Sequence, residues 1–208
     1  MFTDKLNLPI DRERLSQQDQ TLSLAGMTWD DYEKLTKEEC SGYRISYWNG
    51  VITIVSPSQN HEVIERVISI LINAYCRQYN LIYFPMGSTT LKNPPLAGKE
   101  PDTSYTFGSK KSVPDLAVEV IFSSGNIADL EKYKHLRVGE VWFWQNDEIK
   151  FYRLVDSDYV EIKTSFCLSQ LSSEFLSQFV NRGLTESPLI IEADFIDKLF
   201  TIQIVKDI

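Results

Sequence analysis

The stretch that decides the fold reads Leu116-Ala117-Val118-Glu119-Val120-Ile121-Phe122. All its residues except Glu119 are apolar, a pattern typical of a strand buried on both faces of a sheet. A carboxylate in such a strand is costly to bury, so it is normally neutralised, paired or bound to a metal. The stretch therefore predicts both the centre of a sheet and a candidate functional acid within it.

A second acid precedes this strand along the chain. Asp102 follows Pro101 at the start of residues 101–107, which we also interpret as a strand. If the two strands are neighbours, Asp102 and Glu119 converge and offer the oxygen ligands that a hard divalent cation prefers. Alternatively, Asp102 caps a turn and Glu119 pairs with a lysine or arginine. Spacing alone leaves both interpretations open.

Further elements are predicted on either side of these two strands. Thr28 and Asp31 have the spacing of a capping box, which predicts the start of a helix. Asn49-Gly50 predicts a hairpin between residues 43–48 and 51–55. Apolar periodicity and turn residues predict helices over 59–79, 127–138 and 172–180, strands over 81–84, 88–91, 140–145, 149–154 and 159–162, and a loop over 93–98.

This order predicts an α/β fold with a mixed sheet flanked by helices. We expect three parts in the chain. Residues 1–25 form a flexible N-terminal arm, residues 26–165 form the folded domain, and residues 166–208 form a C-terminal helical extension.

Composition limits the classes of function. The chain has 208 residues and a net charge of -8, which argues against strong non-specific binding of nucleic acid through bulk electrostatics but leaves room for a local basic groove. Its three cysteines are widely spaced and favour neither a zinc site nor a disulfide framework, so a cytoplasmic location is expected. The apolar runs are too short to cross a membrane, and the start lacks the apolar segment of a signal peptide.

Lysines are the next candidates, because a cation beside the acids would offset charge that builds on a phosphate. Lys132 and Lys134 lie on the predicted helix over 127–138, shortly after Glu119. The alternative is a solvated helix face, on which Lys134 pairs with Glu131 three residues earlier.

The start of the long helix offers additional acids. Glu62 and Glu65 share a helix face and are candidates to complete a metal site, although acids in a first turn also interact favourably with the helix dipole. His61 is interpreted as a structural residue. The aromatic residues 142–144, with Phe151 and Tyr152, are either core residues or a platform on which bases stack.

Several segments, in this order, resemble a known family. They are residues 43–58 with Asn49-Gly50, His61, residues 87–90, 100–102, 114–120, 124–125 and 140–144. Together they are similar to the bacterial family of putative restriction endonucleases (Uma2-like) in the PD-(D/E)XK nuclease superfamily. The resemblance runs from about residue 27 to residue 165.

The resemblance implies a restriction-endonuclease-like core with the order α-β-β-β-α-β, preceded by a helix and a hairpin. It implies that Asp102 and Glu119 are the motif acids and that Glu62 or Glu65 joins them. Relatives carry a lysine four residues before a tyrosine on the following helix. Here that tyrosine corresponds to Tyr133, and the earlier position holds Asp129.

The leading hypothesis is a Mg²⁺-dependent endonuclease, with Mn²⁺ as a substitute, in which Asp102 and Glu119 hold the ion and Lys132, or else Lys134, positions water. The expected partner is nucleic acid, with DNA favoured, and a homodimer would suit double-strand cleavage. No membrane partner is expected. The alternative is a catalytically lapsed nuclease-fold protein that acts as a binding or assembly module. A third hypothesis is a nuclease for single-stranded or structured substrates.

Overall fold

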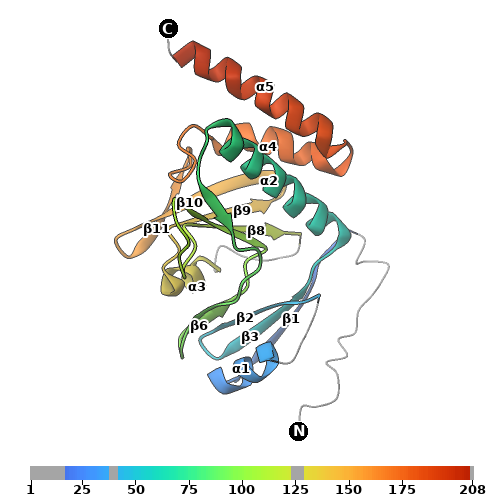
Figure 1. The fold of residues 1–208 in the computed structure, drawn as a ribbon. Helices are drawn as coiled ribbons and strands as arrows, with labels where there is room; N and C mark the ends of the chain where they lie inside the picture. Colours follow the sequence, from blue (N-terminus) through green and yellow to red (C-terminus); the bar gives the residue numbers. More distant parts are fainter. Residues whose placement is uncertain (1–16, 38–41, 123–128, 207–208) are drawn as a thin grey trace.

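The structure is a computed structural model that describes residues 17–37, 42–122 and 129–206. Its first half contains β1 (Gln20–Ala25), α1 (Trp29–Lys37), β2 (Arg44–Trp48), β3 (Val51–Ser56), α2 (Gln59–Gln78), β4 (Tyr83–Pro85), β5 (Leu91–Asn93), β6 (Ala97–Lys99) and β7 (Thr103–Phe107). Its second half contains β8 (Leu116–Ile121), α3 (Asp129–Leu136), β9 (Glu140–Gln145), β10 (Glu148–Val155), β11 (Asp158–Ile162), α4 (Ser173–Val180), the 3-10 helix η2 (Asn181–Leu184) and α5 (Pro188–Lys206). Figure 1 shows β1, β2 and β3 with α1 at one end of the molecule and α4 and α5 at the other.

The larger sheet contains the strand from which the prediction began. Its order is β11-β10-β9-β8-β7-β4, with β8 parallel to β9 and antiparallel to β7. The first five residues of β8 are buried, which confirms the predicted core strand. Thr103 pairs with Val118 in the register of β7 and β8. Asp102 therefore enters the sheet beside Glu119.

The second sheet has the order β1-β3-β2-β6-β5 and is antiparallel throughout. The predicted hairpin is confirmed as β2 and β3, with Asn49 at φ 48° and Gly50 at φ 76° in its turn. The α/β class is also confirmed. The expectation of a single sheet is wrong, because the hairpin belongs to this second sheet.

Two segments expected to lack regular structure form strands of the second sheet. Residues 20–25, assigned to the flexible arm, form β1 and pair along their length with β3, whereas residues 1–16 lie outside the described residues. Residues 93–98, predicted as a loop, contain the turn between β5 and β6 and most of β6 itself. In both segments the local sequence has only a weak preference for strand, and backbone hydrogen bonds to a neighbouring strand stabilise the extended conformation.

Helices α2, α4 and α5 share the core of the larger sheet, whereas α1 packs against β2 of the second sheet. Ser58 caps α2, and its Oγ accepts a hydrogen bond from the backbone N–H of His61 at 3.1 Å. The predicted capping box of α1 is also confirmed, because the backbone N–H of Thr28 donates to Asp31 at 2.9 Å. The main core joins buried residues of α2 and β8 to residues of α4 and α5, including Leu176, Phe179 and Phe195. The C-terminal helices therefore complete the core of the larger sheet.

The aromatic residues of β9 and β10 belong to the core. Trp142, Phe143, Trp144, Phe151 and Tyr152 are all buried, and the rings of Trp142 and Phe151 stack with centroids 4.3 Å apart. The alternative that they form a platform for bases is therefore wrong, because no base can reach them in this fold.

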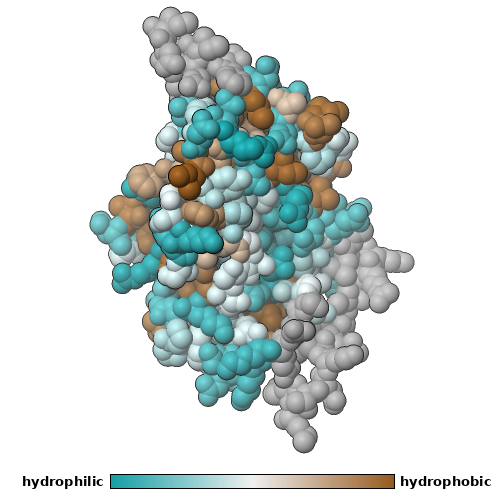
Figure 2. Space-filling view, viewed as in Figure 1, coloured by the Kyte–Doolittle hydropathy of each residue, from teal (hydrophilic) through white to brown (hydrophobic). Residues whose placement is uncertain are grey.

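Hydrophobic surface is found near the start of α5, at the upper right of Figure 2, where Leu189 and Ile190 are exposed. No helix within the described residues has the length and apolar character needed to cross a membrane. Cys76 and Cys167 are free thiols, and Cys40 lies outside the described residues.

Candidate active site

A cavity of about 440 Å³ opens where the two sheets meet. One wall is the face of β1 and β3, and the opposite wall comes from β8, the start of α2 and α3. The lining residues are Asp19, Thr21, Ser23, Arg44, Trp48, Val51, Thr53, Val55, His61, Lys99, Asp102, Glu119, Val120, Ile121, Asp129 and Lys132. The cavity therefore combines acidic and basic side chains from both halves of the sequence.

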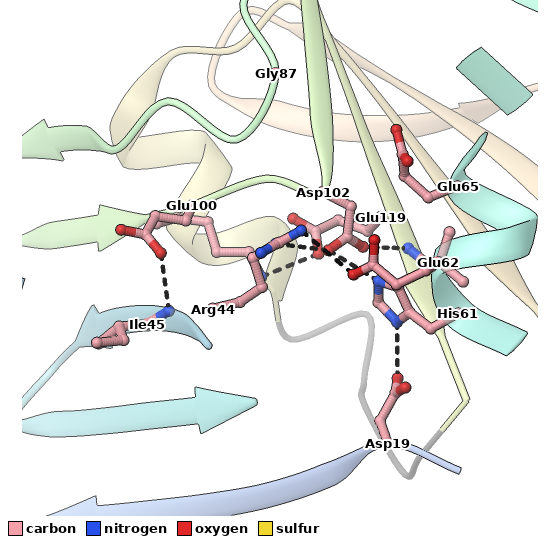
Figure 3. A network of polar contacts seen from close by, with 12 residues as sticks. Asp19, Arg44, Ile45, His61, Glu62, Glu65, Gly87, Glu100, Asp102 and Glu119 are labelled. Atoms are coloured by element: carbon pink, nitrogen blue, oxygen red, sulfur yellow. Dashed lines mark hydrogen bonds and ion pairs between the residues drawn. The ribbon is translucent and has the colours of Figure 1, made fainter. Parts of the chain in front are cut away.

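Asp102 and Glu119 both line this cavity, as the sequence predicted for two neighbouring strands. Their side chains lie side by side in Figure 3. Asp102 is 6% exposed and Glu119 is 5% exposed, so water screens their charges poorly. Two buried carboxylates so close together are stable only when nearby cations, hydrogen-bond donors or bound protons compensate their charge, and the structure provides such cations and donors.

Asp102 is held by three groups. Its Oδ1 lies 3.0 Å from Nε2 of His61 and 3.5 Å from Nε of Arg44, both as ion pairs. Its Oδ2 accepts a hydrogen bond from the backbone N–H of Val120 at 2.7 Å. Burial alone would raise the pKa of Asp102, but the charge and contact of His61, with Lys99, hold it below its ordinary value. Asp102 is therefore ionised at neutral pH.

Glu119 is in a different electrostatic environment. Its Oε2 lies 3.0 Å from Nζ of Lys99, and its Oε1 accepts a hydrogen bond from the hydroxyl of Tyr133. Burial is the largest influence and, with the negative charges of Asp102 and Asp129, raises the pKa of Glu119 to about 7 against the opposing effect of Lys99. The two acids thus differ in proton affinity, a property common in functional sites.

Lys99, like Asp19 and Arg44, is a residue of this site that the sequence patterns did not identify. It ends β6 and is only 5% exposed. Its ammonium contacts Glu119 at 3.0 Å and Oδ2 of Asp129 at 3.3 Å. Burial would lower the pKa of Lys99, but the charges of Asp129, Glu119 and Asp102 raise it. The available signal was its position three residues before Asp102, which the predicted loop over 93–98 obscured.

Lys132 also lines the cavity, and its ammonium is paired with residues other than the two candidate acids. It donates to Oδ1 of Asp129 at 2.7 Å and to Oγ of Ser46 at 2.9 Å. Burial lowers the pKa of Lys132, whereas Lys99 and Lys132 together hold the pKa of Asp129 at about 2 despite its burial. Lys132 thus connects α3 to β2.

Lys134 lies outside the cavity. Its ammonium contacts Asp158 at 2.5 Å and Glu131 at 4.0 Å on the surface of the protein. This geometry matches the alternative of a solvated helix face. The structure therefore does not bring Lys134 to the acids, because its position on α3 directs it toward β11.

The two candidate acids of α2 also lie outside the lining of the cavity. Oε1 of Glu62 contacts Arg44 at 3.6 Å, and Oε1 of Glu65 accepts a hydrogen bond from Ser69 at 2.8 Å. The helix instead directs His61 toward the acids. Over the ranges 17–37, 42–122 and 129–206, no cluster of three or more Asp, Glu, His or Cys side chains is arranged to hold a metal ion.

His61 connects Asp102 to the N-terminal strand region. Its Nδ1 lies 3.0 Å from Oδ2 of Asp19, on the opposite side of the ring from Asp102 (Figure 3). Asp19 also accepts hydrogen bonds from the backbone N–H groups of Ser58 at 2.8 Å and Phe122 at 3.2 Å. Burial would lower the pKa of His61, but the two carboxylates raise it to about 10. His61 is therefore a cation at neutral pH.

The residues present fit a hard divalent ion in part. Two carboxylates facing one cavity are the oxygen donors that Mg²⁺ accepts, and the ion commonly retains water and phosphate oxygens at its other positions. Burial, followed by the charges of Asp102 and Asp129, raises the pKa of Glu119, and a bound cation would favour its ionised form. Each carboxylate oxygen already contacts a protein donor, so an ion would compete with those donors.

The fold defines a class, the α/β proteins with a nuclease fold. A solved structure, described as a putative nuclease belonging to DUF820 from Anabaena variabilis ATCC 29413, has a similar fold with a TM-score of 0.52 at 15% sequence identity. The match covers 74% of this chain and 99% of that chain. This likeness agrees with the expected restriction-endonuclease-like core.

Residues 29–185 match the Uma2 family, which is described as "Putative restriction endonuclease", and the chain belongs to that family. The match confirms the resemblance noted in the sequence and extends it beyond residue 165. No curated protein matches the chain.

Proposed function

We propose that this protein is a Mg²⁺-dependent endonuclease that hydrolyses phosphodiester bonds of nucleic acid, with DNA as the expected substrate. The observation that carries the proposal is the convergence of two buried acids, Asp102 and Glu119, in one cavity with a buried ammonium. Membership of a family of restriction-endonuclease type supports the same reaction class.

In this proposal, Asp102 and Glu119 hold the metal ion. A bound Mg²⁺ would polarise a phosphoryl oxygen and lower the pKa of a bound water. The protein's own side chains have separate tasks. His61 and Arg44 orient Asp102 by ion pairs, and the hydroxyl of Tyr133 orients Glu119. Both acids are thereby preorganised before substrate arrives.

The cavity contains basic side chains that could bind an anionic substrate, although the chain as a whole has a net charge of -8. Arg44, His61, Lys99 and Lys132 all line it. A phosphate entering the cavity would meet these cations at short range, where the low dielectric strengthens their effect. Asp19, Asp102, Glu119 and Asp129 line the same cavity, so the attraction for a phosphate also depends on the divalent ion that Asp102 and Glu119 would hold.

The test is nicking of a supercoiled plasmid with Mg²⁺ or Mn²⁺, comparing the protein with Asp102→Asn. Cleavage should require the metal and should fall by about a hundredfold or more in Asp102→Asn, as expected when a preorganised charge is removed. Asp158→Asn is the matched control, because Asp158 is exposed and pairs with Lys134. Metal-dependent cleavage that survives in Asp102→Asn, or none with either metal, would contradict the proposal.

The second candidate is a catalytically lapsed relative that binds a partner. It is favoured by one observation: all four oxygens of Asp102 and Glu119 already contact protein donors. Titration calorimetry separates the two functions. A lapsed protein binds nucleic acid or protein equally with Mg²⁺ or EDTA, whereas the nuclease binds Mg²⁺ through Asp102. A homodimer stays a prediction, which light scattering would check.

A further inference from the structure

We propose that Lys99 is the catalytic lysine of this site, and that Asp129 on α3 positions its ammonium. The inference rests on the proposed endonuclease function and names a residue beyond the acids. It replaces the expectation that Lys132 or Lys134 supplies the cation. In this scheme Asp129 and Lys132 are positioning residues.

The contacts of the three lysines distinguish them. The ammonium of Lys99 contacts Glu119, one of the two acids proposed to hold the ion, at 3.0 Å. The ammonium of Lys132 is bound by Asp129 and by Ser46 at 2.9 Å. Lys134 is on the surface with Asp158. Of these three lysines, Lys99 is thus the one whose ammonium contacts an acid proposed to hold the ion.

Asp129 holds Lys99 from the start of α3, which packs against β6. Its Oδ2 lies 3.3 Å from Nζ of Lys99, while its Oδ1 accepts from Lys132 at 2.7 Å. The side chain of position 129 therefore ends where the ammonium of Lys99 lies. A lysine at position 129 and an acid at position 99 would place the same two charges in the same region. The positive charge would then come from α3 and the negative charge from β6.

The second sheet fixes Lys99 on both sides along the chain. Gly98 pairs with Tyr47 of β2, and a Cβ at position 98 would overlap the ring of Tyr32, so glycine allows β6 to pack closely there. After Lys99, the carboxylate of Glu100 accepts from the backbone N–H of Ile45 at 3.2 Å and from Thr90 at 2.9 Å. These contacts fix the backbone of β6, so the long side chain of Lys99 extends into the site from a fixed position.

In the hydrolysis, the oxygen of water bonds to phosphorus and the bond from phosphorus to the leaving sugar oxygen breaks. One proton of the water passes to solvent, and the leaving oxygen takes one from solvent. Lys99 keeps its protons throughout. Its ammonium stabilises the negative charge that builds on the phosphate oxygens, and it also orients Glu119.

The test compares Lys99→Met with Lys134→Met, a matched change at a partly exposed lysine outside the cavity. We expect Lys99→Met to lower single-turnover cleavage by about a hundredfold or more, and Lys134→Met to leave it unchanged. Mn²⁺ binding, followed by electron paramagnetic resonance, should be equal or tighter in Lys99→Met, because a cation that competes for Glu119 is gone. A role in folding alone would weaken metal binding and cleavage together.

A charge exchange keeps the inference testable if Lys99→Met does not fold. Lys99→Asp combined with Asp129→Lys retains the set of charges. We expect this double variant to cleave at least about tenfold faster than Lys99→Asp alone. A folded double variant that cleaves no better than Lys99→Asp would overturn the exchange. Wild-type cleavage by Lys99→Met would overturn the catalytic role while leaving the endonuclease intact. Absence of cleavage by the unmodified protein would instead remove the proposed function.

Discussion

Nε2 of His61 lies 3.0 Å from Oδ1 of Asp102, while Nδ1 of the same ring lies 3.0 Å from Asp19. One imidazolium thus joins a residue beside the N-terminal strand to the acid that enters β7. All three side chains are buried. The site therefore depends on a residue of the first segment, although Asp19 and Asp102 are far apart in sequence.

Replacing His61 should destabilise the fold. His61→Ala leaves two buried carboxylates without their shared cation, and loss of one member of a buried ion pair costs about 3 kcal/mol or more. Urea unfolding in EDTA measures the change. His135→Ala is the control, because His135 is the other histidine of the chain and is not fully buried. Equal midpoints for the two variants would refute the role of His61.

The charge of His61 should make stability depend on pH. Because the folded pKa of His61 is raised to about 10, its contribution is fully present below the unfolded pKa of about 6.5 and is lost as pH rises through the folded pKa. The groups that face the ring are the carboxylates of Asp19 and Asp102, and the pKa of Asp102 is held below its ordinary value. Melting temperatures of wild type and His61→Ala, in EDTA from pH 6 to pH 10, should therefore converge as pH rises. A constant gap would show that the imidazolium charge is not involved.

Gly98→Ala should destabilise the second sheet by about 1–3 kcal/mol, because overpacking forces neighbouring groups to shift. The added methyl would overlap the ring of Tyr32. A double-mutant cycle with Tyr32→Leu measures the coupling, since removing the ring should relieve most of the clash. Strictly additive free energies of unfolding would show that Tyr32 is not the obstacle.

Glu140 should anchor the C-terminal part of the chain. Its buried carboxylate accepts from the indole N–H of Trp142 at 2.5 Å and from the backbone N–H groups of Phe166 at 2.8 Å and Cys167 at 2.9 Å. Glu140→Gln should cost about 1.5–3 kcal/mol, the range for hydrogen bonds to a charged group. The exposed Glu148→Gln is the control. Proteolysis near residue 166 should accelerate only in Glu140→Gln, and unchanged rates would contradict the anchoring role.

Local patterns were sufficient to predict most of the elements. The Asn49-Gly50 turn, the capping of α1, the helical periodicity of α2 and the apolar run of β8 all depend on neighbours in the chain, and each agrees with the structure. Family resemblance added the pairing of the two acids. The strands β1 and β6 were missed because their main stabilisation is hydrogen bonding to distant strands.

The sequence by itself determined the α/β class and the central strand with its acid, because both follow from local patterns, and the family resemblance implied that Asp102 joins Glu119. Only the tertiary structure decided which cation accompanies those acids. Lys99 and His61 reach them from β6 and α2, and Lys132 is bound by Asp129 and Ser46 instead. The physical reason is that a buried charge is stabilised by whichever opposite charge the packing of separate elements brings within a few ångströms, and distance along the chain does not reveal that partner.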